Sequence, residues 1–290
     1  MNDLLLKKVK RIEIATRRMM DDFMSGGYKS HFKGQGVQFS EHRQYTPGDD
    51  IRHIDWKVSA RSRDPLIKQY EEERELSVFI IADLSASVEF GSKNQSKKEI
   101  VAELGAMIAF AASTSGDKVG VLIVTDRVEK IIQLKKGKNH VRRIIHDLLS
   151  FPTKPGGTAL KQAMEETRRM MKNAGIVFIL SDFKAEGYES AIRQLARKHD
   201  VVAVLIEDPS EKEFVELGTF RLVDPETGAE VEVNPSNYTF QKEFHAYQKA
   251  FEQKTKQIFN LAGVEVLPVN THEDHAERLL HFLKRRKQKR

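Results

Sequence analysis

The sequence has 290 residues, enough for one large domain or for one domain with an accessory segment. It is 40% hydrophobic and 31% charged, as in ordinary globular proteins, and its lack of cysteine excludes disulfides and thiolate metal sites. The N-terminus lacks the apolar core of a signal peptide, and no apolar run reaches membrane-spanning length. We therefore expect a cytoplasmic protein without a transmembrane segment.

The positive net charge is confined to the end of the chain. Residues 284–290 hold six of the 48 Lys and Arg residues and no acid, and without them 42 basic residues face 42 acidic ones. Such a basic tail can touch nucleic acid or anionic lipid. More often it is a solvated helix end that complements the negative end of the helix dipole, and we favour that interpretation.

The first quarter of the chain contains two different patterns. Over residues 3–23, apolar side chains recur at helical spacing between Lys and Arg residues, which predicts an amphipathic helix docked on its own domain. Residues 28–75 show no strong period, although 66–70 has the composition of a short strand. Their many charges predict either a salt-bridged structural network or a recognition surface, and the residue pattern leaves both open.

From residue 75 onward, strand and helix patterns alternate, which predicts an α/β fold with a doubly wound, mainly parallel sheet. A tight turn between the second and third strands predicts one antiparallel edge, and a later turn predicts a hairpin on the sheet edge. We expect strands over 78–82, 119–124, 128–134, 176–180, 201–206 and 264–269, hairpin strands over 220–223 and 229–233, and helices over 97–113, 140–149, 158–172, 189–198, 237–261 and 275–286.

These patterns divide the chain into three parts. Residues 1–74 hold the N-terminal helix and the irregular segment. Residues 75–283 form the α/β domain, with the hairpin inserted at about 218–234. Residues 284–290 form the basic tail.

Three oxygen-bearing side chains follow the first buried strand at its carboxyl end. Asp83, Ser85 and Ser87 stand on alternate residues, at the edge where open α/β sheets bind ligands. A carboxylate with two hydroxyls suits Mg²⁺ or Mn²⁺ better than zinc. Alone the pattern is weak, because Asp and Ser are also common loop and N-cap residues.

Two further oxygen ligands extend this set. Thr158 follows a pair of glycines where a helix opens, and Asp182 follows the strand predicted over 176–180. In a doubly wound sheet that strand and the first strand become neighbours where the winding direction reverses. The five side chains then come within reach of one divalent cation, and a vacant position on it could accept a carboxylate from another protein.

The five residues Asp83, Ser85, Ser87, Thr158 and Asp182 resemble the metal-ion-dependent adhesion site of von Willebrand factor A domains, whose sheet is Rossmann-like. The resemblance implies direct ligation through Ser85, Ser87 and Thr158. It implies that Asp83 and Asp182 act mostly through water or hydrogen bonds.

A longer resemblance covers roughly residues 28–235. The blocks 34–39, 43–56 and 59–61 resemble the signature of the bacterial domain of unknown function 58 family, in which it precedes a von Willebrand A-like domain. Val88 and Gln38 depart from the residues that the family often has there, Met and Glu. The signature residues that could form a partner surface are Arg43, Tyr45, Asp49, Asp50, Arg52, Asp55, Trp56 and Arg61.

The family resemblance implies a partnership with MoxR-type AAA+ ATPases that help mature or remodel protein complexes. The chain has no Gly-x-x-x-x-Gly-Lys-Ser/Thr phosphate loop, so it does not supply the ATPase activity itself. The favoured interpretation is therefore a non-enzymatic, metal-dependent protein-interaction module that serves as an adaptor.

Two alternatives stay open. The first is a Mg²⁺-dependent phosphotransferase of the haloacid-dehalogenase type, but that chemistry needs an acid/base Asp at the position of Ser85. The second is nucleic-acid or membrane-surface binding through the basic tail and the first helix, without sequence-specific nucleic-acid recognition. His272 and His275 form a loose pair, and without a cysteine or a His-Glu-x-x-His pattern we expect surface residues rather than zinc ligands.

Overall fold

The computed structural model describes Lys10, Ile12, Ile14, Thr16 and residues 37–62, 64–72, 76–92, 95–152, 156–212, 219–223, 230–234 and 236–289. The chain divides into two compact units. One unit is Lys29–Leu76, and the other comprises Met1–Tyr28 and Ser77–Arg290.

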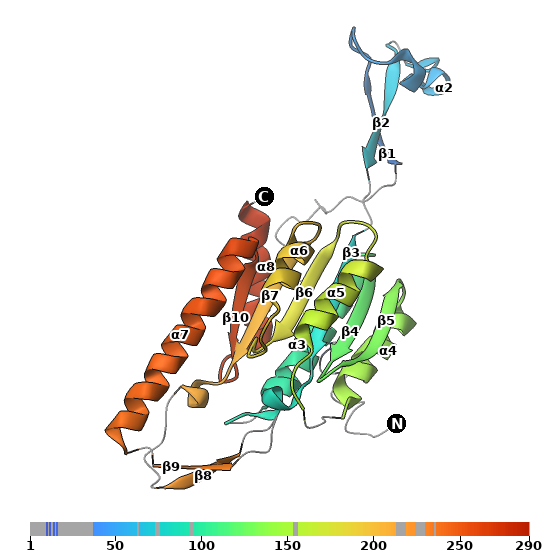
Figure 1. Ribbon diagram of the computed structural model, residues 1–290. Helices are drawn as coiled ribbons and strands as arrows, with labels where there is room; N and C mark the ends of the chain where they lie inside the picture. Colours follow the sequence, from blue (N-terminus) through green and yellow to red (C-terminus); the bar gives the residue numbers. More distant parts are fainter. Residues whose placement is uncertain are drawn as a thin grey trace. The chain divides into compact units, whose positions relative to one another are not determined.

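The larger unit is built around one six-stranded sheet with the order β10-β7-β6-β3-β4-β5 (Figure 1). Neighbouring strands are parallel except for β4 and β5, so the predicted antiparallel edge is confirmed. The neighbours β4 and β6 lie on opposite sides of β3, where the winding reverses, and the predicted doubly wound α/β fold is confirmed. The strands are β3 (Ser77–Asp83), β4 (Lys118–Val124), β5 (Val128–Lys135), β6 (Ile176–Ser181), β7 (Asp200–Glu207) and β10 (Glu265–Asn270).

Helices cover both faces of this sheet. On one face α3 (Lys97–Thr114) packs between α4 (Lys138–Ser150) and α8 (His275–Lys289). The other face carries α5, α6 and α7, and Figure 1 shows α5 and α6 in front of the strands. These three helices are α5 (Leu160–Met170), α6 (Glu189–Ala196) and α7 (Tyr238–Ala262).

The central position of α3 explains its composition. It is apolar on nearly every side because the sheet lies beneath it and a helix flanks it on either side. A Cβ atom on Gly105 would lie 3.0 Å from Leu148 Cδ1, so glycine allows α3 and α4 to approach closely here. The helix begins with a capping box in which Ser96 and Glu99 each accept from the other's backbone N–H.

The predicted hairpin forms, but its expected place is wrong. Strands β8 (Phe220–Val223) and β9 (Glu230–Val233) pair with each other as a separate two-stranded sheet. The outer strands of the six-stranded sheet are β5 and β10. The two four-residue strands are close in sequence, so pairing with each other costs less loop-closure entropy than pairing with a more distant edge strand.

The smaller unit is more regular than the sequence predicts. Strand β1 (Val37–Gln44) pairs antiparallel with β2 (Leu66–Glu72), and η1 (Ile51–His53) and α2 (Trp56–Ser59) lie between them. The predicted strand at 66–70 lies within β2. Strand β1 is missed because its sequence, VQFSEHRQ, carries polar residues at both alternating sets of positions, so no period of two is visible.

The predicted N-terminal helix lies mostly outside the described residues. The four described positions are helical, with Ile12 and Thr16 buried and Lys10 and Ile14 exposed. Buried residues four apart agree with the amphipathic pattern. Among all the helices that the structure describes, none combines the length and apolar character needed to cross a bilayer.

Candidate metal and partner-docking site

Asp83 is the last residue of β3, and its side chain is fully buried. One carboxylate oxygen accepts the backbone N–H of Ser85 at 3.0 Å, and the other accepts the Ser181 hydroxyl at 2.6 Å. Burial and the nearby charge of Asp182 raise the pKa of Asp83 to about 6, although the bonds from Ser181 and Ser85 oppose the rise. Asp83 therefore ties the loop after β3 to the end of β6.

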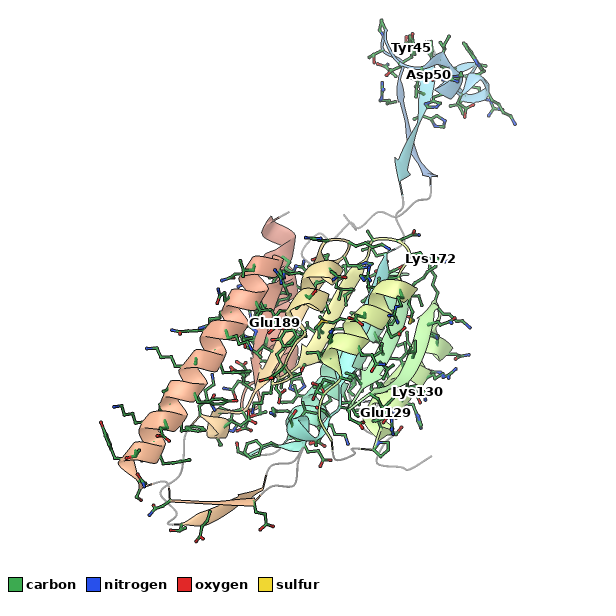
Figure 2. The ribbon with its side chains drawn as sticks, viewed as in Figure 1. Tyr45, Asp50, Glu129, Lys130, Lys172 and Glu189 are labelled. Atoms are coloured by element: carbon green, nitrogen blue, oxygen red, sulfur yellow. The ribbon has the colours of Figure 1, made fainter. Side chains whose placement is uncertain are left out.

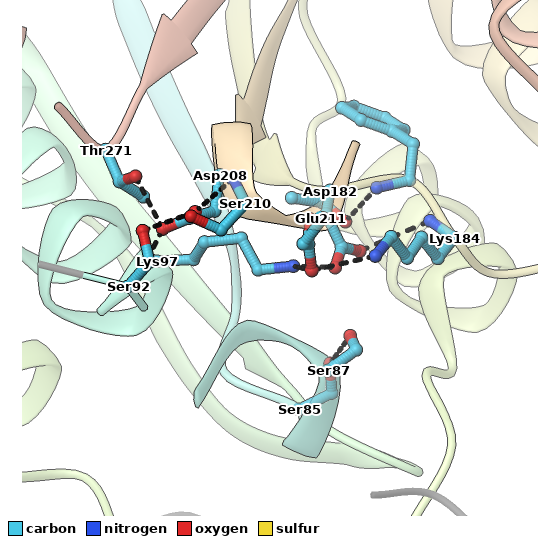
Figure 3. A network of polar contacts seen from close by, with 12 residues as sticks. Ser85, Ser87, Ser92, Lys97, Asp182, Lys184, Asp208, Ser210, Glu211 and Thr271 are labelled. Atoms are coloured by element: carbon cyan, nitrogen blue, oxygen red, sulfur yellow. Dashed lines mark hydrogen bonds and ion pairs between the residues drawn. The ribbon is translucent and has the colours of Figure 1, made fainter. Parts of the chain in front are cut away.

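The two predicted serine ligands converge. Ser85 and Ser87 lie on the turn that contains η2 (Ala86–Glu89), and their Oγ atoms are 3.2 Å apart (Figure 3). Ser85 stands at the N-cap position of η2, yet its side chain makes no capping hydrogen bond. Its hydroxyl faces Ser87 instead, so the N-cap explanation of this serine does not account for it.

Asp182 follows β6 and is nearly fully buried. Its Oδ1 atom accepts the backbone N–H of Lys184 at 3.2 Å. Between them, Phe183 has a φ of 56°, a left-handed conformation that is rare for a bulky residue. The Phe183 ring is buried, with its centroid 4.9 Å from that of Phe259 and 5.8 Å from that of Tyr188. Core packing of this ring holds the turn that presents Asp182.

Lys97 is the central cation of this site, and no motif in the sequence points to it. It is the first residue of α3, its side chain is fully buried, and its Nζ atom lies 2.8 Å from Asp182 Oδ2. The same Nζ atom lies 2.8 Å from Glu211 Oε1, at the end of η3 (Pro209–Glu211). Lys184 Nζ reaches Glu211 Oε1 at 2.9 Å, so two ammonium groups share one carboxylate (Figure 3).

The charge state of Lys97 follows from these contacts. Burial would lower the pKa of the ammonium, but the charges and hydrogen bonds of Asp182 and Glu211 outweigh it and raise the pKa. Lys97 therefore stays positively charged at neutral pH. A buried charge of this kind is tolerated only where it is paired and hydrogen-bonded.

Thr158 is half-buried and lies two residues before α5. The next residue, Ala159, donates its backbone N–H to the Thr125 carbonyl at 2.7 Å, which fixes this loop beside the carboxyl end of β4. Strand β4 is the neighbour of β3. Within the described part of the chain, no hydrogen bond joins Thr158 to the two serines, so its membership of the site stays a prediction.

A second buried carboxylate, Asp208, fastens the loop beyond η2. It accepts both the N–H and the hydroxyl of Ser92, at 2.9 and 2.7 Å, and the hydroxyl of Thr271 at 2.7 Å. The N–H of Ser210 adds a fourth bond at 2.9 Å. Burial alone would raise the pKa of Asp208, but these hydrogen bonds lower it well below its ordinary value.

The geometry of the hydroxyl pair can be compared with what a metal ion requires. Neighbouring ligands of an octahedral Mg²⁺ lie about 3 Å apart, because each is about 2.1 Å from the ion. The Ser85–Ser87 separation of 3.2 Å fits this. No group of three or more His, Cys, Asp or Glu among the described residues has metal-site geometry, so a cation here would depend on hydroxyl ligands.

The signature residues of the smaller unit separate into two kinds. Four of the eight pair with one another at the end of β1 and in the segment that follows it, where Figure 2 labels Tyr45 and Asp50. Arg43 and Asp49 form two bonds of 2.7 Å, and Arg52 binds Asp50 at 2.8 Å. These contacts support the structural-network interpretation for those residues.

The other signature residues either contact neighbouring segments of the smaller unit or are exposed to solvent. Asp55 caps α2, accepting from the backbone N–H groups of Lys57 and Val58, and lies 3.2 Å from the His42 ring. Tyr45 joins its backbone N–H to the carbonyl of Pro65. Arg61 is exposed, and Trp56 is 68% exposed. Trp56 and Arg61 are therefore the signature residues best placed for an external partner.

Two other features of the sequence have local structural partners. His272 bonds the Ser92 hydroxyl at 2.8 Å, and His275 bonds Glu103 at 2.9 Å, so the loose histidine pair is directed at separate groups. In the basic tail, Arg286 lies 2.6 Å from Asp200 and 2.8 Å from Glu265. At least this member of the tail is used within the fold.

The family model described as "Protein of unknown function DUF58" matches residues 41–255. The chain belongs to the DUF58 family. The uncharacterized protein Rv1480 of Mycobacterium tuberculosis is 26% identical over 288 residues, which cover 98% of this chain and 90% of that protein. The uncharacterized protein YeaD of Bacillus subtilis is 27% identical over 131 residues, 45% of this chain and 30% of YeaD.

Among solved structures, this DUF58 chain is similar to the conserved hypothetical protein BatB from Bacteroides thetaiotaomicron. The identity is 14% with a TM-score of 0.45, covering 73% of this chain and 99% of BatB. It is also similar to the VWA domain of SpRpn10, at 9% identity and a TM-score of 0.41, covering 71% of this chain and 94% of that domain.

Proposed function

We propose that this DUF58 chain is a non-enzymatic protein-interaction module that binds Mg²⁺ or Mn²⁺ at the carboxyl edge of its sheet and docks a carboxylate of a partner protein there. The observation that carries the proposal is the Ser85–Ser87 hydroxyl pair, whose Oγ atoms are 3.2 Å apart and which follows the buried Asp83. The bound ion would act as a Lewis acid that accepts the partner's carboxylate.

In this proposal each residue has a defined role. Ser85, Ser87 and Thr158 are the direct ligands. Asp83 has both oxygens engaged by protein donors, so it holds the Ser85 backbone and supplies negative charge from behind the ligands. Asp182 supplies the second negative charge, and its remaining lone pairs can accept hydrogen bonds from water bound to the ion.

The same geometry argues against the phosphotransferase alternative. A nucleophilic aspartate must present a free oxygen to the phosphorus atom. Asp83 is fully buried and accepts a hydrogen bond on each oxygen, and the position of the required acid/base is occupied by Ser85. An interaction role needs neither group to react.

The proposed partner is a MoxR-type AAA+ ATPase, for which the chain would serve as an adaptor in the cytoplasm. This part of the proposal rests on the family resemblance. On the smaller unit, the exposed Trp56 and Arg61 belong to residue types that are enriched among the strongest contributors to protein interfaces. We therefore assign the ATPase contact to this surface and the client's carboxylate to the metal site.

Metal titration of the full chain tests the central claim. Calorimetry should detect Mg²⁺ and Mn²⁺ binding to the wild type, weakened at least about tenfold in Ser87→Ala, since a direct ligand is lost. Ser150→Ala, at the end of α4, is the matched control and should bind as the wild type does. Equal binding by Ser87→Ala and the wild type, or no binding by either, would overturn the metal site.

A further inference from the structure

The carboxyl edge already contains a cation of its own. Lys97 Nζ lies within 2.8 Å of an oxygen of both Asp182 and Glu211, and its side chain has no exposed surface. The cluster contains two ammonium groups, those of Lys97 and Lys184, which contact Asp182 and Glu211. Asp83 adds a third carboxylate, next to Asp182. The fixed charges of this cluster sum to a single negative charge, which is less than a divalent cation would need for neutrality.

Lys97 lies where a positive charge is unfavourable. It is the first residue of α3, where the helix dipole disfavours a positive charge. Its neighbour Lys98 has a side chain that reaches solvent, while Lys97 is fully buried. Because both the dipole and burial oppose the ammonium, the stabilisation that the described residues offer it comes from its two carboxylate partners.

We propose that Lys97 is a built-in competitor of the divalent cation: it holds Asp182 in place without metal and lowers the affinity of the Ser85–Ser87 pair for Mg²⁺ or Mn²⁺. This inference rests on the proposed function and adds its regulation. The ammonium neutralises the charge of Asp182 that would otherwise attract the ion. Metal binding is then weak and conditional rather than permanent.

The contact with Glu211 gives this competition a structural connection. When a metal ion draws on Asp182, Lys97 keeps its second partner, Glu211, at the end of η3. The Glu211 backbone carbonyl accepts the Gln248 side chain of α7 at 3.1 Å. These contacts form a continuous series from Asp182 through Lys97 and Glu211 to α7.

The test removes the ammonium and measures metal binding by the full chain. Lys97→Met should bind Mg²⁺ and Mn²⁺ at least about tenfold more tightly than the wild type in calorimetry, because no ammonium then offsets the negative charge of Asp182. Its thermal midpoint without metal should fall, and added Mg²⁺ should raise that midpoint by more than it raises the wild type's. A midpoint shift requires no knowledge of the partner.

Two further variants make the outcome decisive. Lys184→Met removes the other ammonium from Glu211, but its side chain is 41% exposed and makes no side-chain contact with Asp182, so metal affinity should change by less than about threefold. If Lys97→Met does not fold, Lys97→Gln keeps a hydrogen-bond donor without the charge and replaces it. Unchanged or weaker metal binding by the neutral variant overturns the competitor role.

The failures of the two proposals are distinguishable. If the wild type binds metal and Ser87→Ala does not, the metal site stands, and only the Lys97 variants decide whether Lys97 competes. If neither the wild type nor the neutral Lys97 variant binds metal, both proposals are overturned.

Discussion

The Lys97 ammonium and the Asp182 carboxylate form a buried ion pair with a separation of 2.8 Å. The pair joins the first residue of α3 to the turn after β6, two segments 85 residues apart. Removal of one partner leaves an uncompensated charge in the interior, whereas removal of both takes that charge away and leaves Glu211 paired with Lys184. The two consequences differ enough in size to be measured.

We expect Lys97→Met to lower the free energy of unfolding by about 3–5 kcal/mol in metal-free buffer. The double variant Lys97→Met with Asp182→Asn should recover at least about 1 kcal/mol of that loss, since the unpaired carboxylate is gone. Urea unfolding of the wild type, both single variants and the double variant completes the cycle. Strictly additive losses would contradict a coupled pair.

The contribution of Asp208 to the free energy of unfolding should decrease at acid pH. Asp208→Asn weakens four hydrogen bonds to a buried carboxylate, and we expect a loss of about 3 kcal/mol at pH 7. Because the folded-state pKa lies below the unfolded value of about 3.9, this contribution is present above pH 4 and lost as the pH falls further.

Urea unfolding at pH 5 and pH 3 measures this difference for Asp208. The difference in the free energy of unfolding between the wild type and Asp208→Asn should be smaller at pH 3 than at pH 5. Ser92→Ala, which removes one hydroxyl donor and keeps the carboxylate, should cost about 1 kcal/mol at both pH values. A gap that stays constant from pH 5 to pH 3 would refute the assignment.

His199 is a buried group whose replacement should stabilise the protein. Its side chain is 4% exposed, and neither ring nitrogen has a hydrogen-bond partner among the described residues. Burial and the adjacent Lys198 lower the pKa of His199. The unfolded chain therefore takes up a proton first, so stability falls as the pH drops below about 6.5, by at most about 1.4 kcal/mol per pH unit.

Two substitutions separate the effects at His199. His199→Leu should raise the free energy of unfolding by about 1–3 kcal/mol at pH 7.5, and this gain should grow at pH 5.5. His199→Gln removes the titration but keeps a polar group, so it should flatten the pH dependence without the gain at pH 7.5. If His199→Gln retained the full wild-type pH dependence, another group would be responsible.

Trp56 is the only tryptophan in the chain, so fluorescence reports on it alone. We expect emission typical of a water-exposed indole in the free protein and a blue shift when the proposed partner, a MoxR-type ATPase, is added. Trp56→Ala should weaken that complex by about 2 kcal/mol while changing stability by less than about 0.5 kcal/mol. Tyr238→Ala, an exposed aromatic residue on α7, is the matched control.

Either of two results would contradict this prediction for Trp56. A blue-shifted spectrum in the free protein would mean that the indole is already covered. Equal ATPase binding by Trp56→Ala and the wild type would remove this residue from the interface.

The sequence predicts the sheet well because its central strands are buried on both faces. Residues 78–82 and 176–180 form continuous apolar runs, and the structure places them side by side in β3 and β6. That adjacency brings Asp83 close to Asp182, as the winding rule predicts. The structure also shows the convergence of Ser85 and Ser87. The position of Thr158 relative to them stays a prediction.

What the sequence does not reveal are residues whose partners come from distant segments. Lys97 and Lys98 are two adjacent lysines at the start of a helix. Their burial differs only because of the fold, which buries the side chain of Lys97 and leaves that of Lys98 partly exposed. The available signal is its place at the start of a helix that is apolar on nearly every side. Asp208 is missed for the same reason, since its donors Ser92 and Thr271 lie 116 and 63 residues away.

The anchoring of Arg286 affects how the role of the basic tail should be tested. Asp200 and Glu265 are the first residues of β7 and β10. The guanidinium of Arg286 therefore acts as a clamp that joins the end of α8 to the beginnings of both strands. A chain shortened before residue 284 would lose that clamp together with the surplus charge. Weaker nucleic-acid or vesicle binding by such a chain could then reflect a loosened helix, whereas a cut after Arg286 would separate electrostatics from architecture.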